Sequence, residues 1–234
     1  GGKTIVMEKK NTILLTVIAV ATLLVAVVGA TFAYFTATSS VTGDGNEGTV
    51  NTATNIGSVA INQTDIAASN NTIYPGTMNY VGTIIQATKT DTTENFTLDY
   101  SLTGTVSVTA AFAHDITWKL YKVAASETSP VSCQPVTETA TATGTQYSQS
   151  CTLGKSLTGD SVGDGSLVAK GTLTAGETSS SVSYADGSVD TDGGSDYYYL
   201  VVEYPNKQES QNADQGKDIK MTINKVAITN TTQK

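Results

Sequence analysis

Residues 116–123, Ile-Thr-Trp-Lys-Leu-Tyr-Lys-Val, decide the fold class of this 234-residue chain. Large apolar side chains at Ile116, Trp118 and Leu120 alternate with a threonine and a lysine. A period of two is typical of a β-strand that has one face on a core and the other face toward solvent. We therefore predict a strand here, with the side chains of Ile116, Trp118 and Leu120 facing the core.

Similar short runs lie on both sides of this strand. Residues 96–102, 167–173, 197–204 and 219–226 have the composition of strands, and Gly, Pro and Asn residues separate them. No segment after residue 35 has a sustained helical period. Many short strands with such turn residues are typical of antiparallel β-proteins. The sequence predicts a mainly β fold, an antiparallel two-sheet sandwich of the jelly-roll or immunoglobulin-like kind, preceded by one N-terminal hydrophobic helix.

Two local signals refine this prediction. Pro75-Gly76 suits the central positions of a type II turn, so we expect the chain to reverse there. Tyr197, Tyr198 and Tyr199 are consecutive, and consecutive side chains of a strand point to opposite faces of the sheet. At least one of these three tyrosines is therefore predicted to lie in the core.

The start of the chain indicates where the protein is found, inside or outside the cell. Lys9 and Lys10 precede an uncharged apolar run over residues 13–35, which ends in the stretch GATFAYF at residues 29–35. A basic region, an apolar region and small residues before a polar chain make an export signal. Residues 1–35 are therefore predicted to be an export signal of an extracellular or cell-surface protein. About 20 apolar residues also span a bilayer, so a retained membrane or filament helix is the alternative.

Composition predicts how the rest of the chain is organised. Residues 36–48 are polar and rich in glycine, which predicts a flexible exit segment. Residues 49–234 then form one β-sandwich domain with an insert at about residues 124–194. Within that insert, residues 186–196 are acidic and rich in glycine, and we expect them to form a loop.

Cys133 and Cys151 are the two cysteines of the chain. An even number of cysteines in an exported protein predicts a disulfide. Closing a loop of this size stabilises a fold by on the order of 3 kcal/mol in the chain-entropy account. Two free thiols are the alternative, because some exported proteins of Gram-positive bacteria avoid disulfides.

Charge and motif content exclude several functions. The net charge is −8 and all 13 basic residues are lysines, which argues against a nucleic-acid partner. The single histidine, His114, cannot form an HExxH motif or a Cys/His zinc site, and the sequence has no G-x-S-x-G or P-loop motif. We expect His114 at the surface or at a strand end, and we predict that the protein is not an enzyme.

Acidic residues are the best candidate metal ligands. Asp186, Asp190, Asp192 and Asp196 lie within one Gly/Ser-rich stretch. Calcium takes several oxygen ligands from such stretches, although the spacing here differs from that of an EF-hand. We prefer a solvated turn, and we expect no cofactor other than calcium.

Three stretches together resemble a known family. Residues 29–35 (GATFAYF) resemble the signal-peptide ending of proteins that a SipW-type signal peptidase processes in Gram-positive bacteria. Pro75-Gly76-Thr77, with residues 82–85 and 96–98, resembles a PGD turn and paired strands, although threonine replaces the aspartate. Residues 199–233 resemble a terminal strand pair. These features are similar to those of the TasA/camelysin-like family, and they cover both ends and part of the middle.

The resemblance implies a secreted fibre subunit of a biofilm matrix. It implies cleavage between Ala33 and Tyr34, with cleavage between Ala30 and Thr31 as the alternative. The freed N-terminal segment then adds a strand to a neighbouring subunit. By position, this polymerisation segment contains Tyr34, Phe35, Val41 and Val50. The implied partners are other copies of the chain and a signal peptidase, and the membrane only through an uncleaved helix.

Two further hypotheses stay open at this point. A pilin-like filament subunit or a membrane-anchored adhesin would retain the N-terminal helix. Camelysins are described as metallo-endopeptidases, but this sequence lacks the histidines that a zinc protease needs. The true N-terminus of the extracellular protein separates the secreted fibre subunit from the protein that retains its helix.

Overall fold

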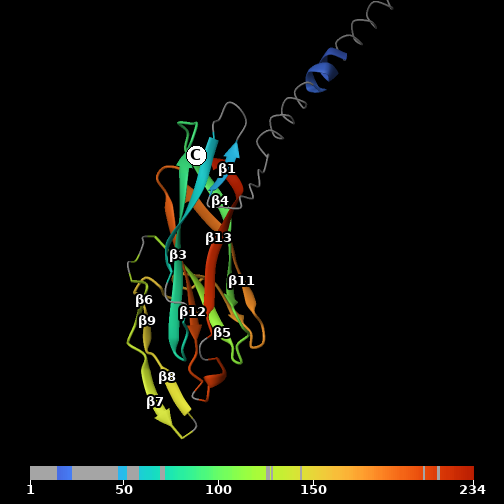
Figure 1. Ribbon diagram of the computed structural model, residues 1–234. Coiled ribbons are helices and arrows are strands. Elements are labelled where there is room, and N and C mark those ends of the chain that lie inside the picture. The colour runs from blue at the N-terminus through green and yellow to red at the C-terminus, as the bar shows by residue number, and fades with distance from the viewer. Residues whose placement is uncertain are drawn as a thin grey trace, which may run out of the picture. The chain divides into compact units, whose positions relative to one another are not determined.

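Two antiparallel β-sheets face each other within residues 39–234 of this computed structural model (Figure 1). The six-stranded sheet has the spatial order β1 (Glu47–Asn51), β2 (Ser58–Ala68), β3 (Thr77–Lys89), β12 (Ser195–Tyr204), β5 (Ile116–Val123) and β10 (Leu167–Leu173). The three-stranded sheet has the order β11 (Ser179–Asp190), β4 (Phe96–Val108) and β13 (Ile219–Gln233). The predicted mainly β sandwich is confirmed.

The structure describes nine stretches of the chain. The chain divides into two units, residues 1–38 and residues 39–234. The described residues are 15–22, 47–51, 58–68, 72–124, 127, 129–142, 144–207, 209–214 and 217–234.

The predicted N-terminal hydrophobic helix is confirmed over residues 15–22, which are drawn in blue in Figure 1. Its large apolar side chains are exposed, with Leu15 at 69% and Val17 at 60%. Within the described residues, no helix has the length and apolar character needed to cross a membrane. The predicted cleavage residues Ala33 and Tyr34, together with Phe35 and Val41, lie outside the described residues.

The main core lies between the two sheets. Ile116, Trp118 and Leu120 are all buried in it, as the period of two predicts. The indole Nε1 of Trp118 donates a hydrogen bond of 3.0 Å to Ser180 Oγ on β11, which links the two sheets. The predicted turn is also confirmed, because Thr77 N donates to Tyr74 O at 2.9 Å while the intervening glycine has a φ of 77°.

A second apolar cluster covers the outer face of the six-stranded sheet. Tyr198 is buried in the main core, whereas Tyr199 is buried in this second cluster, so both faces of β12 are covered. Tyr121 of β5 also lies in the second cluster, although the alternation in that strand predicts an outer face toward solvent. The cover includes Val131 and Leu153, which belong to the segment that carries the cysteines.

The predicted insert at about residues 124–194 is too long. Its last part forms β10, which pairs with β5, and β11, which pairs with β4, so both strands belong to the sandwich. The predicted loop at residues 186–196 is also wrong, because β11 continues to Asp190 and β12 starts at Ser195. The reason is that β11 is serine-rich and largely exposed, so its sequence carries almost no apolar alternation.

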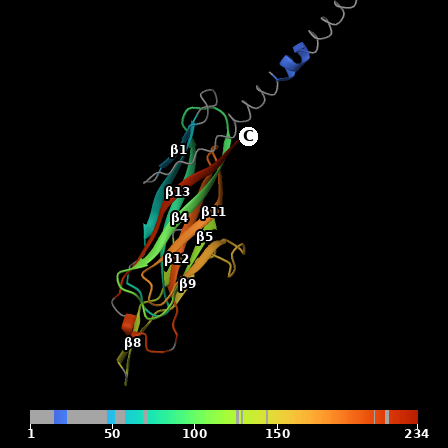
Figure 2. The ribbon, with the colours of Figure 1, turned by 90° about the vertical axis from the view of Figure 1, so that its right-hand side faces the viewer.

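The part of the insert that lies outside both sheets contains two short strand pairs. β6 (Val131–Cys133) pairs with β9 (Cys151–Leu153), and β7 (Thr137–Thr141) pairs with β8 (Gly144–Ser148). The β7–β8 hairpin lies at the end of the sandwich opposite β1 and the C-terminus in both views (Figures 1 and 2). We call this end the distal end.

Candidate functional site

The predicted disulfide is present. Cys133 and Cys151 are bonded with an S–S distance of 2.12 Å, and they are directly opposite each other in the β6–β9 pair. Beyond them, Gln134 N donates to Ser150 O at 2.8 Å, which continues the ladder toward the β7–β8 hairpin. The disulfide therefore closes the base of the projecting hairpin.

The four aspartates proposed as calcium ligands do not form one site. Asp190 Oδ1 accepts a hydrogen bond from Thr97 Oγ1 at 2.8 Å, and its Oδ2 forms an ion pair with Lys234 at 2.8 Å. These interactions lower the pKa of Asp190, the bond from Lys234 most. Asp186 and Asp192 are exposed. Within the described residues, no group of three or more His, Cys, Asp or Glu side chains is placed to hold a metal ion.

Asp196 belongs to a buried tyrosine cluster instead. Its Oδ2 forms an ion pair with Lys122 Nζ at 2.8 Å and accepts a hydrogen bond of 2.5 Å from Tyr100. The hydroxyl groups of Tyr100 and Tyr198 are 2.7 Å apart. Burial is the main cause that raises the pKa of both tyrosines far above the usual value, so both stay neutral. This cluster joins β4 of one sheet to β12 of the other.

A second buried polar cluster is centred on Asp214, which sequence reasoning missed. Asp214 is 1% exposed, and its carboxylate accepts hydrogen bonds from four donors. They are the amide of Ala113 at 2.7 Å, His114 Nδ1 at 2.9 Å, Tyr204 OH at 2.8 Å and Lys217 Nζ at 3.0 Å. Burial raises the pKa of this carboxyl group, but the four bonds outweigh burial and lower the pKa to about 2.

His114 lies just before β5, at a strand end as predicted. Because a carboxylate can only accept, the hydrogen bond to Asp214 places the ring proton on Nδ1. The Nε2 atom lies 3.6 Å from Glu209 Oε1, so the imidazole lies between two carboxylates. The pair joins residues 100 positions apart and fixes the β12–β13 connection against the β4–β5 connection. The His114–Asp214 contact therefore has a structural role, because it holds these two connections together.

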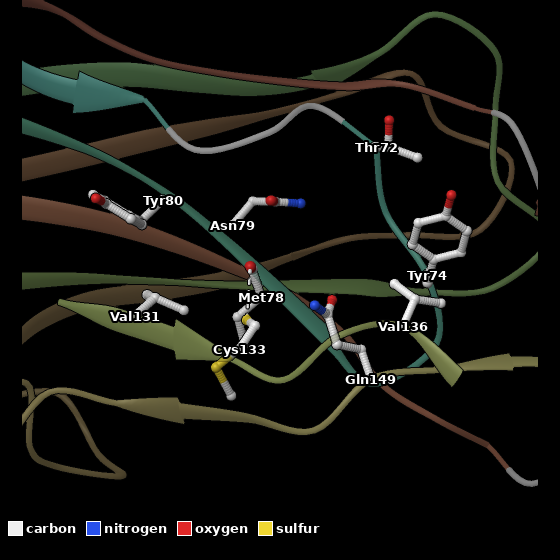
Figure 3. Close-up of a pocket in the computed structure, with 9 residues that line it drawn as sticks. All are labelled: Thr72, Tyr74, Met78, Asn79, Tyr80, Val131, Cys133, Val136 and Gln149. Carbon is white, nitrogen blue, oxygen red and sulfur yellow. Dashed lines mark hydrogen bonds between the residues drawn. The ribbon is translucent and has the colours of Figure 1, made fainter. Parts of the chain in front are cut away.

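Two hollows lie along the disulfide segment. The first has a volume of about 400 Å³ and is lined by the nine residues labelled in Figure 3. Met78 and Tyr80 of β3 form one side, and Val131 and Cys133 of the insert form the other. The Sγ atom of Cys133 lies 3.7 Å from the carbonyl oxygen of Met78, as the dashed line in Figure 3 marks.

The second hollow lies at the distal end and has a volume of about 360 Å³. We call it the distal hollow. Thr139, Gln146, Tyr147 and Ser148 of the β7–β8 hairpin line one wall, and polar residues of the β12–β13 connection line the other. The Tyr147 ring packs against Tyr74 with centroids 5.5 Å apart, and Tyr74 also lines the first hollow.

Comparison with known proteins adds no family to this description. No protein-family model matches the chain, and no curated protein matches it. The resemblance to the TasA/camelysin-like family stays a prediction.

Proposed function

We propose that this chain is an exported structural subunit of a bacterial surface fibre or biofilm matrix, extracellular or held at the cell surface. The subunits assemble through strand addition by the N-terminal segment. The partners are other copies of the same chain, and a signal peptidase that releases the segment. The proposed role needs no catalytic residue, nucleic acid or cofactor.

The observation that carries this proposal is an incompletely paired strand. β1 pairs only with residues 58–62 of β2, from Asn51 opposite Ser58 to Glu47 opposite Asn62. Within the described residues, no strand pairs with residues 63–68 of β2 on the β1 side. Open backbone N–H and C=O groups of this kind are a template for a strand from another chain.

The polymerisation segment ends in the strand at this same edge. Val50, assigned to the polymerisation segment, lies in β1 and is paired with Val59 of its own chain. A segment just before β1 is therefore well placed along the chain to pair with the open half of β2, either in its own subunit or in a neighbour. The apolar residues 15–22 support export, because they belong to an apolar run that follows Lys9 and Lys10, and this order is typical of an export signal.

Electron microscopy of the secreted protein tests the proposal. We expect fibres from protein that starts near Tyr34, and loss of fibres when residues 34–46 are deleted. Thr64→Lys places a charge on the open half of β2, where the threonine is exposed, and it should block assembly. Thr93→Lys makes the same change in the exposed β3–β4 turn and should leave fibres intact. Secreted protein that stays monomeric, or fibres that survive the deletion, would contradict the proposal.

A retained helix is the second candidate function. The exposed apolar side chains of residues 15–22 also fit a pilin-like filament subunit or a membrane-anchored adhesin. N-terminal sequencing of the extracellular protein separates the two. A start near Tyr34 favours strand addition, and a start at or before Lys10 favours the retained helix.

A further inference from the structure

The β7–β8 hairpin has no role in the apolar core. Every residue of β7 is exposed. In β8 the last two residues, Tyr147 and Ser148, are partly buried and the other three are exposed. An isolated two-stranded hairpin is at best marginally stable in water. This one is attached through the disulfide at its base, the Tyr74–Tyr147 ring contact and a 3.3 Å hydrogen bond from Gln149 N to Pro75 O. The fold therefore holds in place a polar hairpin that lies outside both apolar clusters.

The wall that faces the hairpin is fixed by buried polar contacts. Gln211 is 5% exposed, and its amide group accepts from Lys207 N at 3.1 Å and donates to Pro205 O at 3.0 Å. Asp214, three residues further, is held by its four donors. Gln211 bonds the backbone of this connection, whereas Asp214 ties the connection to Ala113 and His114 of the β4–β5 connection and to Tyr204 of β12, so the wall is preorganised before any ligand arrives.

The groups that these walls present are mainly neutral and polar. Gln146, Asn206 and Asn212 supply amides, Thr139 supplies a hydroxyl group, and Tyr147 supplies an aromatic ring. Side-chain amides both donate and accept, so they match hydroxyl groups that do the same. The aromatic ring adds an apolar face, as is common in small-molecule sites of this volume.

Charge narrows the class of ligand. The described residues that line the distal hollow include one carboxylate, Glu209, whose side chain is 61% exposed, and no lysine. A carboxylate accepts strongly from neutral hydroxyl groups and repels anions. The net charge of −8 disfavours an anionic ligand further.

We propose that the distal hollow binds a neutral carbohydrate. A pyranose ring would lie against Tyr147, and its hydroxyl groups would pair with Glu209 and the amides on the two walls. The site is at the opposite end from β1 (Figures 1 and 2), so strand addition at the β1 edge leaves it open. The inference goes beyond the proposed structural role, and either can fail without the other.

Saturation-transfer NMR on the secreted protein tests this inference. The probes are cellotetraose, maltotetraose and chitotetraose, with hexagalacturonate as an anionic comparison and an unstructured Gly/Ser peptide as a second comparison. We expect at least one neutral oligosaccharide to bind at millimolar concentration or below. We also expect hexagalacturonate and the peptide to give no response.

Variants place the binding at the distal hollow. Glu209→Gln should weaken the affinity about tenfold, which is the effect of replacing a charged hydrogen-bond acceptor with a neutral one. Tyr147→Ala should weaken the affinity at least as much. If Tyr147→Ala disturbs the hairpin, Gln146→Ala, at an exposed position, tests the same wall. Glu94→Gln makes the same charge change in the exposed β3–β4 turn and should have no effect.

Three results overturn the inference. The first is that no neutral oligosaccharide binds. The second is that only the anionic sugar or the peptide binds. The third is that a neutral oligosaccharide binds with an affinity that Glu209→Gln and Gln146→Ala both leave unchanged.

Discussion

Three glycines of the sheets lie opposite aromatic residues and have no room for a side chain. In each pair the two residues are directly opposite on neighbouring strands, and a Cβ added to the glycine would lie within 3 Å of the ring. The ring covers the space that a side chain would take, which is a known way of stabilising glycine in strands. The three pairs are Gly82–Tyr199, Gly171–Trp118 and Gly187–Tyr100.

The pair on β11 gives the sharpest prediction for a single residue. A Cβ at Gly187 would lie 2.4 Å from the Tyr100 ring, which is fully buried and hydrogen-bonded to Asp196 and Tyr198. Because this ring cannot move aside, Gly187→Ala should lower the free energy of unfolding by about 1–3 kcal/mol. Urea denaturation measures the loss. Ser188→Ala, at the exposed neighbouring position, should change the free energy little, and equal values for the two variants would contradict the prediction.

Asp214 predicts how stability depends on acid. Its pKa is about 2 in the folded protein, against an ordinary value of 3.8. A carboxyl group whose pKa is lower in the folded state stabilises the fold above its unfolded pKa, and this stabilisation is lost as the pH falls through the folded pKa. We expect about 2 kcal/mol of unfolding free energy to be lost between about pH 4 and pH 2 through this group.

Comparison with Asp214→Asn isolates that contribution. The variant cannot titrate at this position, so its unfolding free energy should be lower at neutral pH and should fall less between about pH 4 and pH 2. Chemical denaturation at a series of pH values measures both curves. Parallel curves for the two proteins would show that other carboxyl groups cause the acid loss.

The segment that carries the disulfide has two parts with different roles. Its β6–β9 part packs Val131 and Leu153 on the second apolar cluster, whereas its β7–β8 part is exposed. An exposed hairpin depends on its base, so removing the disulfide should release the tip before it affects the sheets.

Hydrogen exchange of a Cys133→Ser/Cys151→Ser variant tests this role. Amide protection in residues 137–148 should be lost, while protection in β4 and β12 should remain. The entropy account expects a cost of on the order of 3 kcal/mol for the closed loop. Ser132→Ala, at the exposed middle position of β6, is the control. Unchanged protection at the tip would mean that the Tyr74–Tyr147 contact and the Gln149–Pro75 hydrogen bond hold the hairpin without the disulfide.

At the scale of the whole molecule, one apolar core joins the two sheets. Strands from both sheets contribute to it, and the single tryptophan, Trp118, is buried in it at 6% exposure. A shared core predicts cooperative unfolding of the sandwich. Tryptophan fluorescence and far-UV circular dichroism should therefore give the same urea midpoint, and separate midpoints would indicate that the sheets unfold independently.

The sequence by itself determined those features that depend on neighbouring residues. The period of two at residues 116–123 predicted which side chains of β5 face the main core, and Pro75-Gly76 predicted the turn. The even cysteine count predicted the disulfide. Each of these signals is local or compositional, so it can be read without knowing how the strands are arranged.

Only the tertiary structure decided which distant residues meet. Asp214 and His114 are 100 positions apart, and no sequence pattern pairs them. The burial of Tyr199 depends on the insert that covers the outer face, and the place of β11 in the sandwich depends on backbone pairing with β4 rather than on its serine-rich side chains. Contacts between strands join backbone groups that every residue carries, so side-chain patterns do not specify which strands become neighbours.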